Sequence, residues 1–232
     1  MNGKKLIKKL RLSQADFDAI KKAVQDAEVK TNGEIAVATI PESSDYSFYE
    51  LFYAVILGAF AFAAMLSLHQ PIRNFLDHLF WHMSDWYIPA FYGIVSFAAI
   101  GVFFLLANIP AIDRLIIPGS ARRKAVYSRA LRHFTESGVY ATKDRTGILI
   151  FISYMEREVR IVADAGISAK IAQTEWDVIA RDIATGIKTG KVAEAITEAV
   201  TTCGELLTAH FPAKKENPNE LADGLVVLEV HT

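Results

Sequence analysis

Two long runs without a charged residue most constrain what this chain can fold into. The first extends from Leu51 to Leu68, and the second from Trp86 to Ile112 between Asp85 and Asp113. A helix rises ~1.5 Å per residue, so the first run covers roughly 27 Å, close to the ~30 Å hydrocarbon core of a bilayer. The second run is longer and opens with an aromatic pair typical of the membrane interface. Each run can therefore form a transmembrane helix.

The alternative interpretation makes both runs core helices of a soluble protein. Hydrophobic residues make up 52% of the 232 positions, but they are concentrated in blocks along the chain. The rest of the chain is too small to wrap two such helices, which are also long for soluble ones. This favours a transmembrane hairpin over residues 47–113, with spans at about 51–68 and 88–110.

Basic residues near the spans predict the orientation of the hairpin. The connector between the spans carries only Arg73, whereas six basic residues follow the second span: Arg114, Arg122, Arg123, Lys124, Arg129 and Arg132. Lysine and arginine accumulate on the cytoplasmic side of membrane proteins. The segment after the hairpin should therefore be cytoplasmic, and two spans place the segment before it on the same side.

The flanking segments show the periodicities of helices and strands. Ser13 and Asp16 have the spacing of a capping box at a helix start. The other predicted elements are strands at 34–40, 147–154 and 159–163, the last two forming an antiparallel hairpin, and helices starting near Gly119, at a Thr174 cap and near Lys191.

A single strand before the hairpin cannot be stable alone, so it should pair with the strands that follow the hairpin. We therefore predict one α/β (α+β) sandwich domain with a small mixed sheet covered by helices, interrupted by the transmembrane hairpin. Its two parts are residues 12–46 and 114–211. Residues 212–232 are predicted to be a flexible tail, and the alternative is a docking strand at 225–228.

Composition excludes several classes of function. A net charge of −1 provides no basic field for nucleic acid, so no nucleic-acid partner is expected. Cys203 is the single cysteine, which excludes an internal disulfide and a multi-cysteine metal site. Glycine-rich phosphate loops and the G-x-S-x-G elbow are absent from the sequence. No catalytic residue and no organic cofactor is assigned.

Three segments resemble the TPM domain family, a small α/β domain of a thylakoid acid-phosphatase-like protein and of many bacterial membrane proteins. The segments are 31–37 (Thr-Asn-Gly-Glu-Ile-Ala-Val), 143–149 (Lys-Asp-Arg-Thr-Gly-Ile-Leu) and 157–161 (Arg-Glu-Val-Arg-Ile). The resemblance covers about Leu12 to Phe211 on either side of the hairpin. It implies a sheet covered by helices, with roles in maintaining membrane complexes, in divalent-cation binding and, in some members, in phosphate-ester hydrolysis.

A cation site would need hard oxygen ligands from loops at strand ends. The candidates are Asp144 before the central strand, Asp164 after the hairpin strand, and Glu175 and Asp177 at the next helix start; Ca²⁺ or Mg²⁺ would be the ion. The alternative role of Asp144 is a turn residue, and that of Asp164 is a loop acid. Glu175 and Asp177 would instead be favourable charges in a first helical turn. The early acid usual in the family is missing, since this region reads Leu10-Arg11-Leu12-Ser13.

The missing acid favours an interaction, assembly or maintenance module at the cytoplasmic membrane face over the alternative, a membrane-tethered, divalent-cation-dependent phosphatase. Any enzyme activity would be a weak acid-phosphatase-like hydrolysis. The two spans and the basic residues predict a multi-pass protein with both termini cytoplasmic, and the resemblance implies the bacterial inner (cytoplasmic) membrane. Its partners would be the lipid bilayer and other membrane proteins.

Overall fold

The computed structural model describes residues 2–82, 84–107, 109–214 and 219–229. The chain divides into two compact units. One consists of Met1–Ser44 with Ser120–Thr232, and the other of Asp45–Gly119. The two units are described separately below.

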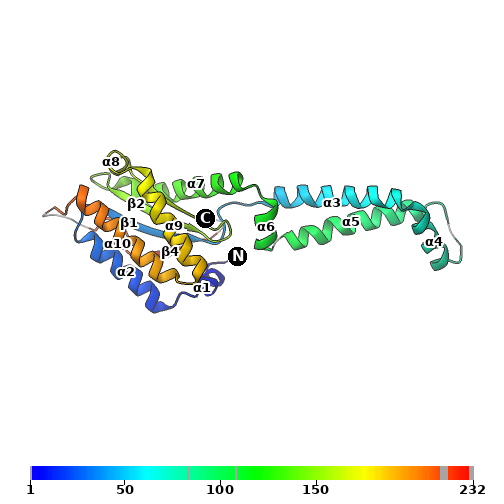
Figure 1. The fold of residues 1–232 in the computed structure, drawn as a ribbon, viewed down its shortest axis with the longest axis horizontal. Coiled ribbons are helices and arrows are strands. Elements are labelled where there is room, and N and C mark those ends of the chain that lie inside the picture. The colour runs from blue at the N-terminus through cyan, green and yellow to red at the C-terminus, as the bar shows by residue number, and fades with distance from the viewer. Residues whose placement is uncertain (1, 83, 108, 215–218, 230–232) are drawn as a thin grey trace. The chain divides into compact units, whose positions relative to one another are not determined.

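The larger unit contains a mixed four-stranded sheet with the order β3-β2-β1-β4 (Figure 1). The strands are β1 (Glu34–Ile40), β2 (Gly147–Ser153), β3 (Glu158–Ala163) and β4 (Leu225–Val227). β1 is parallel to both β2 and β4, whereas β2 and β3 form the antiparallel hairpin. β1 precedes the two long apolar helices in the chain, and β2, β3 and β4 follow them. The prediction that this first strand pairs with the later strands is therefore confirmed.

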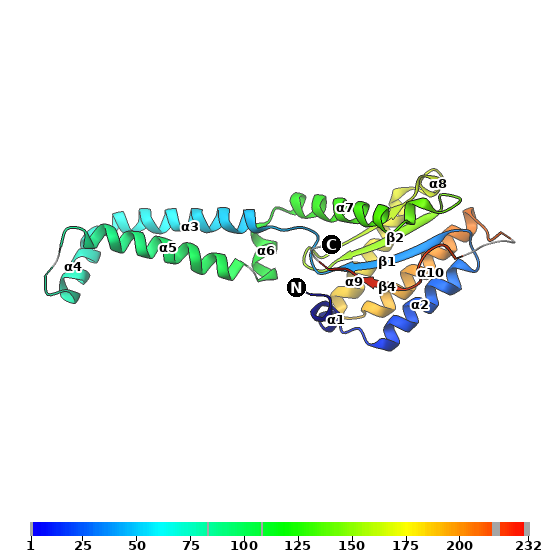
Figure 2. The same ribbon diagram turned by 180° about the vertical axis from the view of Figure 1, so that it is seen from behind.

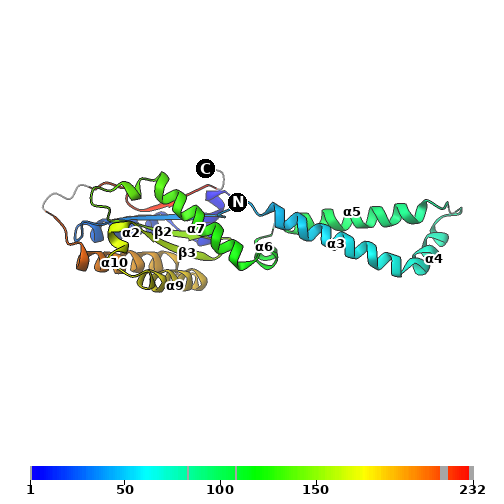
Figure 3. The ribbon, with the colours of Figure 1, turned by 90° about the horizontal axis from the view of Figure 1, so that it is seen from above.

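Helices cover both faces of this sheet (Figure 2). On one face lie α1 (Gly3–Leu10), α2 (Gln14–Glu28), α9 (Gln173–Thr189) and α10 (Val192–His210), and on the other lies α7 (Gly119–Glu136). Figure 3 shows α9 and α10 along one side of the strands. Two short elements, the 3-10 helix η1 (Val139–Ala141) and α8 (Ala165–Ser168), lie in the connections.

The side chains of the central strands alternate between the two faces. In β2, Ile148, Ile150 and Ile152 join the core beneath α2, α9 and α10, whereas Leu149 and Phe151 pack against α7. All seven residues of β2 are buried. This explains the continuous apolar run in the sequence, because a strand covered on both faces has no solvent-facing side.

Helix starts in this unit agree only in part with the sequence prediction. The capping box is confirmed: Asp16 N donates to the Ser13 hydroxyl at 3.3 Å, and Ser13 N donates to the Asp16 carboxylate at 2.7 Å. The Thr174 cap is wrong, because α9 begins at Gln173 after Ala172, and Thr174 lies inside its first turn. The N-cap is Ala172, which makes no side-chain cap hydrogen bond, and the buried face of α9 begins with Trp176.

The flexible tail predicted for residues 212–232 is wrong at 225–227. These residues form β4, paired with Val37, Ala38 and Thr39 of β1, and Leu228 N donates to Thr39 O at 2.8 Å. Leu225 is buried against the core. The physical reason is that β1 would otherwise expose an unpaired edge, and β4 satisfies its backbone groups.

The smaller unit is helical. It contains α3 (Ser47–Ser67), α4 (His69–Leu79), α5 (Tyr87–Ala107) and α6 (Pro110–Ile116). α3 and α5 pack closely at Gly58, where an added Cβ atom would lie 2.5 Å from Ile100 Cγ1. Both helices have 21 residues and, by length and composition, are apolar enough to cross a membrane.

Candidate functional site

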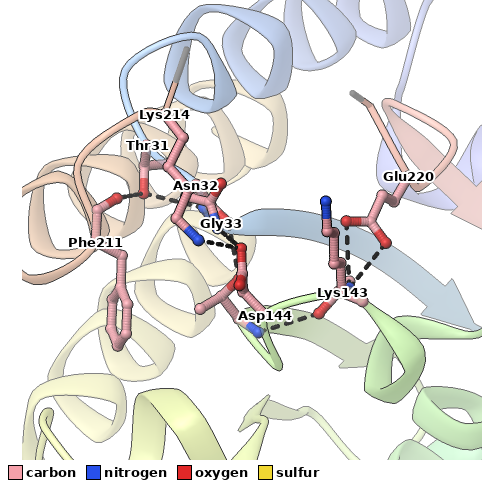
Figure 4. A network of polar contacts seen from close by, with 10 residues as sticks. Thr31, Asn32, Gly33, Lys143, Asp144, Phe211, Lys214 and Glu220 are labelled. Atoms are coloured by element: carbon pink, nitrogen blue, oxygen red, sulfur yellow. Dashed lines mark hydrogen bonds and ion pairs between the residues drawn. The ribbon is translucent and has the colours of Figure 1, made fainter. Parts of the chain in front are cut away.

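Polar residues gather where the two central strands begin. Because β1 and β2 are parallel and pair in register from Glu34 and Gly147, the loops that precede them meet at one edge of the sheet. We call Thr31, Asn32, Asp144, Thr146 and Lys214 the strand-start cluster. Figure 4 shows Thr31, Asn32, Asp144 and Lys214. It brings together the two loop motifs that resemble the TPM family.

Asp144 is the centre of the strand-start cluster. One of its oxygens, Oδ2, accepts a hydrogen bond from Asn32 Nδ2 at 2.5 Å and an ion-pair contact from Lys214 Nζ at 2.6 Å (Figure 4). These two donors lower the pKa of the Asp144 carboxyl, with Lys214 the larger cause. The carboxylate is therefore ionised and already bound to a protein cation.

Hydrogen bonds to backbone carbonyl groups hold the loops of the cluster together. Thr146 Oγ1 donates to Asn32 O at 2.7 Å, and Glu34 N donates to Thr146 O at 3.1 Å. The Thr31 hydroxyl donates to Phe211 O at 2.6 Å and so connects the start of β1 to the end of α10. The side chains of Thr31 and Thr146 therefore connect segments that are distant in the chain.

Local backbone geometry explains the spacing between Asp144 and Gly147. Arg145 has a φ of 55°, in the left-handed region, so the chain turns sharply between Asp144 and β2. A Cβ atom on Gly147 would collide with the carbonyl oxygen of Val139. Only glycine fits there, because the η1 backbone passes directly over this position.

Asp164 lies near the Asp144 loop but has a different role. It is the N-cap of α8, where its Oδ1 accepts from Ala165 N at 2.6 Å. An added Cβ atom on Gly166 would lie 2.5 Å from Arg145 O, so the two loops touch through their backbones. Asp164 is 6% exposed, and its Oδ2 has no hydrogen-bond partner among the described residues.

The remaining two predicted ligands, Glu175 and Asp177, are exposed on α9. Asp177 accepts a hydrogen bond from Gln173 Nε2 at 3.1 Å. Glu175 lines a groove of about 400 Å³ between α9 and α10, and Asp182 and Glu198 line the same groove. Neither residue is part of the strand-start cluster.

Two buried glutamates near the cluster were not identified from the sequence. Glu28 is 7% exposed and accepts from Ile35 N at 2.8 Å; burial raises the pKa of its carboxyl to about 8. Glu34 is 2% exposed, burial raises its pKa, and its Oε2 accepts from Glu220 N and Leu221 N. The position of Glu28 could have indicated its burial, because it lies four residues after Val24 and continues the apolar stripe of α2.

The arrangement does not fit a resident divalent cation. Across residues 2–82, 84–107, 109–214 and 219–229, no group of three His, Cys, Asp or Glu side chains could hold a metal ion. Ca²⁺ takes six to eight oxygen ligands, and Oδ2 of Asp144 already accepts from Asn32 and Lys214. Asp164 Oδ2 supplies one open acceptor, which is not a site.

Comparisons with known proteins support the family resemblance. The protein-family model described as "TPM domain" matches residues 113–206. The NMR structure of BA42 protein from the psychrophilic bacterium Bizionia argentinensis is 18% identical, with a TM-score of 0.54 over 93% of this chain and 94% of that one. At this identity the likeness concerns the fold. A comparison with curated proteins finds no match.

Proposed function

This chain carries a TPM domain, and from that premise we propose that it is a membrane-anchored interaction or assembly module. In this proposal α3 and α5 cross the cytoplasmic membrane of a bacterium, and the TPM-like domain acts at its cytoplasmic face. The partners are the lipid bilayer and other membrane proteins.

The exposed apolar surface of α3 and α5 supports the anchoring. Of the most apolar stretch of 18 residues in each helix, 22% is buried in α3 and 11% in α5. Core helices of soluble proteins are mostly buried. Phe60 of α3 and Phe97 of α5 are 70% and 76% exposed. A continuous apolar surface of this kind needs a partner, and a bilayer supplies one along the whole length of both helices.

The occupied state of Asp144 is the observation that favours a module over an enzyme. Asp144 is bound by Lys214 and Asn32, Asp164 caps a helix, and Glu175 and Asp177 lie on α9. A metal-assisted phosphatase needs acids that converge on one ion to activate water. A module needs only the fold and a recognition surface.

The alternative function is a divalent-cation-dependent phosphatase tethered to the membrane. Its specific support is the buried, unpartnered Oδ2 of Asp164, because an orphaned acceptor is a costly feature that a ligand could satisfy. The Asp144 loop lies beside it. One acceptor is insufficient for the chemistry, so no reaction step is derived from it.

Two measurements test the proposal. The anchoring predicts resistance to alkaline carbonate extraction, with a reporter at His78 outside the cytoplasm and one at the carboxyl terminus inside. Extraction into the aqueous phase, or the opposite reporter pattern, would refute the anchor.

Calorimetric titration of Ca²⁺, Mg²⁺ and Mn²⁺ into the detergent-purified chain separates module from enzyme. The module predicts no saturable binding and no hydrolysis of a phosphate ester. Binding that disappears in both Asp144→Ala and Asp164→Ala, together with metal-dependent turnover, would instead establish the phosphatase.

A further inference from the structure

The outward side of α7 has no covering helix among the described elements. Its inward side chains, Val126, Ala130 and Phe134, pack against β1 and β2. We define the α7 outer face by the six exposed residues between positions 123 and 132: Arg123, Lys124, Tyr127, Ser128, Leu131 and Arg132. In Figures 1 and 2, α7 lies alone on its side of the sheet.

The charge of α7 has one sign along nearly the whole helix. No acidic residue occurs from Gly119 to Thr135, and the acid that ends the helix, Glu136, pairs at 3.3 Å with Arg129. Arg129 is buried, so this pair leaves the outer face unneutralised. The three cations Arg123, Lys124 and Arg132 therefore form a basic surface.

Two large side chains lie among these cations. Tyr127 is 53% exposed and Leu131 is 42% exposed, although a soluble helix would normally carry polar residues there. Tyrosine prefers the membrane interface, where its ring is buried and its hydroxyl remains hydrated. A basic face with an aromatic and an aliphatic residue is typical of helices that lie on anionic membranes.

We propose that the α7 outer face docks on anionic lipid headgroups, which fixes the TPM-like domain against the bilayer. This inference rests on the proposed membrane anchoring. It commits to lipid as the occupant because α7 starts at Gly119, after α5 ends at Ala107. Eleven residues span at most roughly 40 Å, so the connection to α5 confines α7 to the neighbourhood of the bilayer and lets its first turn reach the membrane surface.

The short connection from α5 to α7 and the charge of the α7 outer face both favour docking on the membrane. Each basic residue near an anionic leaflet favours the bound state by roughly fivefold, and the effect decays within a Debye length. Three exposed cations thus favour docking by roughly 100-fold. Arg129 contributes little, since its guanidinium is buried and paired.

The test uses the full chain reconstituted in vesicles of phosphatidylcholine, with or without phosphatidylglycerol. An environment-sensitive fluorophore is placed at Ser128→Cys, on the α7 outer face, and in a control chain at Ala19→Cys, an exposed position of α2. The native Cys203 is fully buried and stays unlabelled under native conditions. α2 lies on the opposite face of the sheet.

We expect a blue shift at position 128 in the vesicles with phosphatidylglycerol, reversed by 1 M salt, and no shift at position 19. Replacing Arg123, Lys124 and Arg132 by Gln should lower the docked-to-undocked ratio by roughly 100-fold. The matched variant, with Lys21 and Lys22 of α2 and Lys30 just after it replaced by Gln, changes the net charge equally and should retain the shift.

Three outcomes would overturn the docking. These are equal spectra at position 128 in both vesicle types, a shift that survives the α7 triple substitution, or a shift that both triple variants abolish. Carbonate extraction of the same vesicles keeps the two proposals apart. An extractable chain refutes the anchor, whereas an anchored chain without a lipid-dependent shift refutes only the docking.

Discussion

The side-chain amide of Asn32 donates a hydrogen bond of 2.5 Å to the carboxylate of Asp144, which lies 112 positions later in the chain. Lys214 contacts the same oxygen from beyond α10. One carboxylate oxygen therefore joins a loop before the hairpin, a loop after it and the segment that leads to β4.

The Asp144–Lys214 pair predicts a salt-sensitive coupling. In a double-mutant cycle of Asp144→Asn and Lys214→Met, the two substitutions should be less than additive in 0.1 M salt. The coupling should disappear in 1 M salt, because the side chains are 34% and 58% exposed and solvent ions screen them. Urea unfolding in detergent measures it, and additivity at low salt would contradict the pair.

Asp144 also makes stability depend on pH in the acid range. Its folded pKa lies below the ordinary value of 3.8, so its contribution is present above that value and is lost as the pH falls through the folded pKa. Asp144→Asn should therefore weaken the loss of stability below pH 4. The same unfolding series, extended to acid pH, tests this, and an unchanged acid limb would argue against it.

Glu28 has the opposite dependence. Burial raises its folded pKa to about 8, above the ordinary value of 4.5, so the folded state retains a proton that the unfolded state releases. Stability should fall as the pH rises from about 5 to 8, at up to ~1.4 kcal/mol per pH unit, and level off above 8. Glu28→Gln should flatten this slope.

The fluorescence of Trp176, fully buried in the core, can follow this unfolding. Trp81 and Trp86 are replaced by Phe in the background so that only the domain reports. A variant with an unchanged slope would show that Glu34, whose pKa is also raised by burial, or another group carries the effect.

Gly147→Ala should destabilise the domain by ~1 to 3 kcal/mol. The new methyl group meets the carbonyl oxygen of Val139, and a backbone atom cannot move aside as a side chain can. Gly101→Ala is a suitable control, because an added Cβ atom there has no neighbour within 4 Å. Thermal unfolding of both variants in detergent gives the comparison, and equal stabilities would be inconsistent with the close approach.

Leu225 and Val226 of β4 provide a matched pair. Leu225 is 9% exposed, so Leu225→Ala should cost ~2 kcal/mol or more, whereas Val226, at 42%, should tolerate alanine within ~0.5 kcal/mol. Hydrogen exchange of the β1 amides would show whether the first variant frees the sheet edge. Equal effects would mean that β4 does not depend on Leu225 packing.

Local patterns in the sequence predicted most of the sheet. Glu34–Ile40 is a strand with the expected bounds, because its end is marked by Pro41 and its interior is β-branched and small. The Ser13 cap was predictable since both partners lie three residues apart. Such features depend on neighbours in the chain, which a sequence displays directly.

Features that depend on distant segments could not be derived from local patterns. β4 has three residues, too few for a period, so a strand at 225–228 was only the alternative to a flexible tail; it forms because the β1 edge is available. Lys214 binds Asp144 across 70 positions, and nothing near either residue indicates the other. The candidate acids were chosen by position at strand ends, but their partners decide their chemistry.

The parallel pairing of β1 with β2 determines when this domain can form during synthesis. Glu34 pairs with Gly147, so β1 cannot pair until Gly147 has been synthesised. At ~5 to 20 residues per second the intervening chain takes roughly 5 to 20 s to emerge from the ribosome. During that interval β1 is an unpartnered apolar segment, and α3 and α5 are translated in the same period. A pause in translation after α5 would therefore prolong the time in which β1 is unpaired and prone to aggregation.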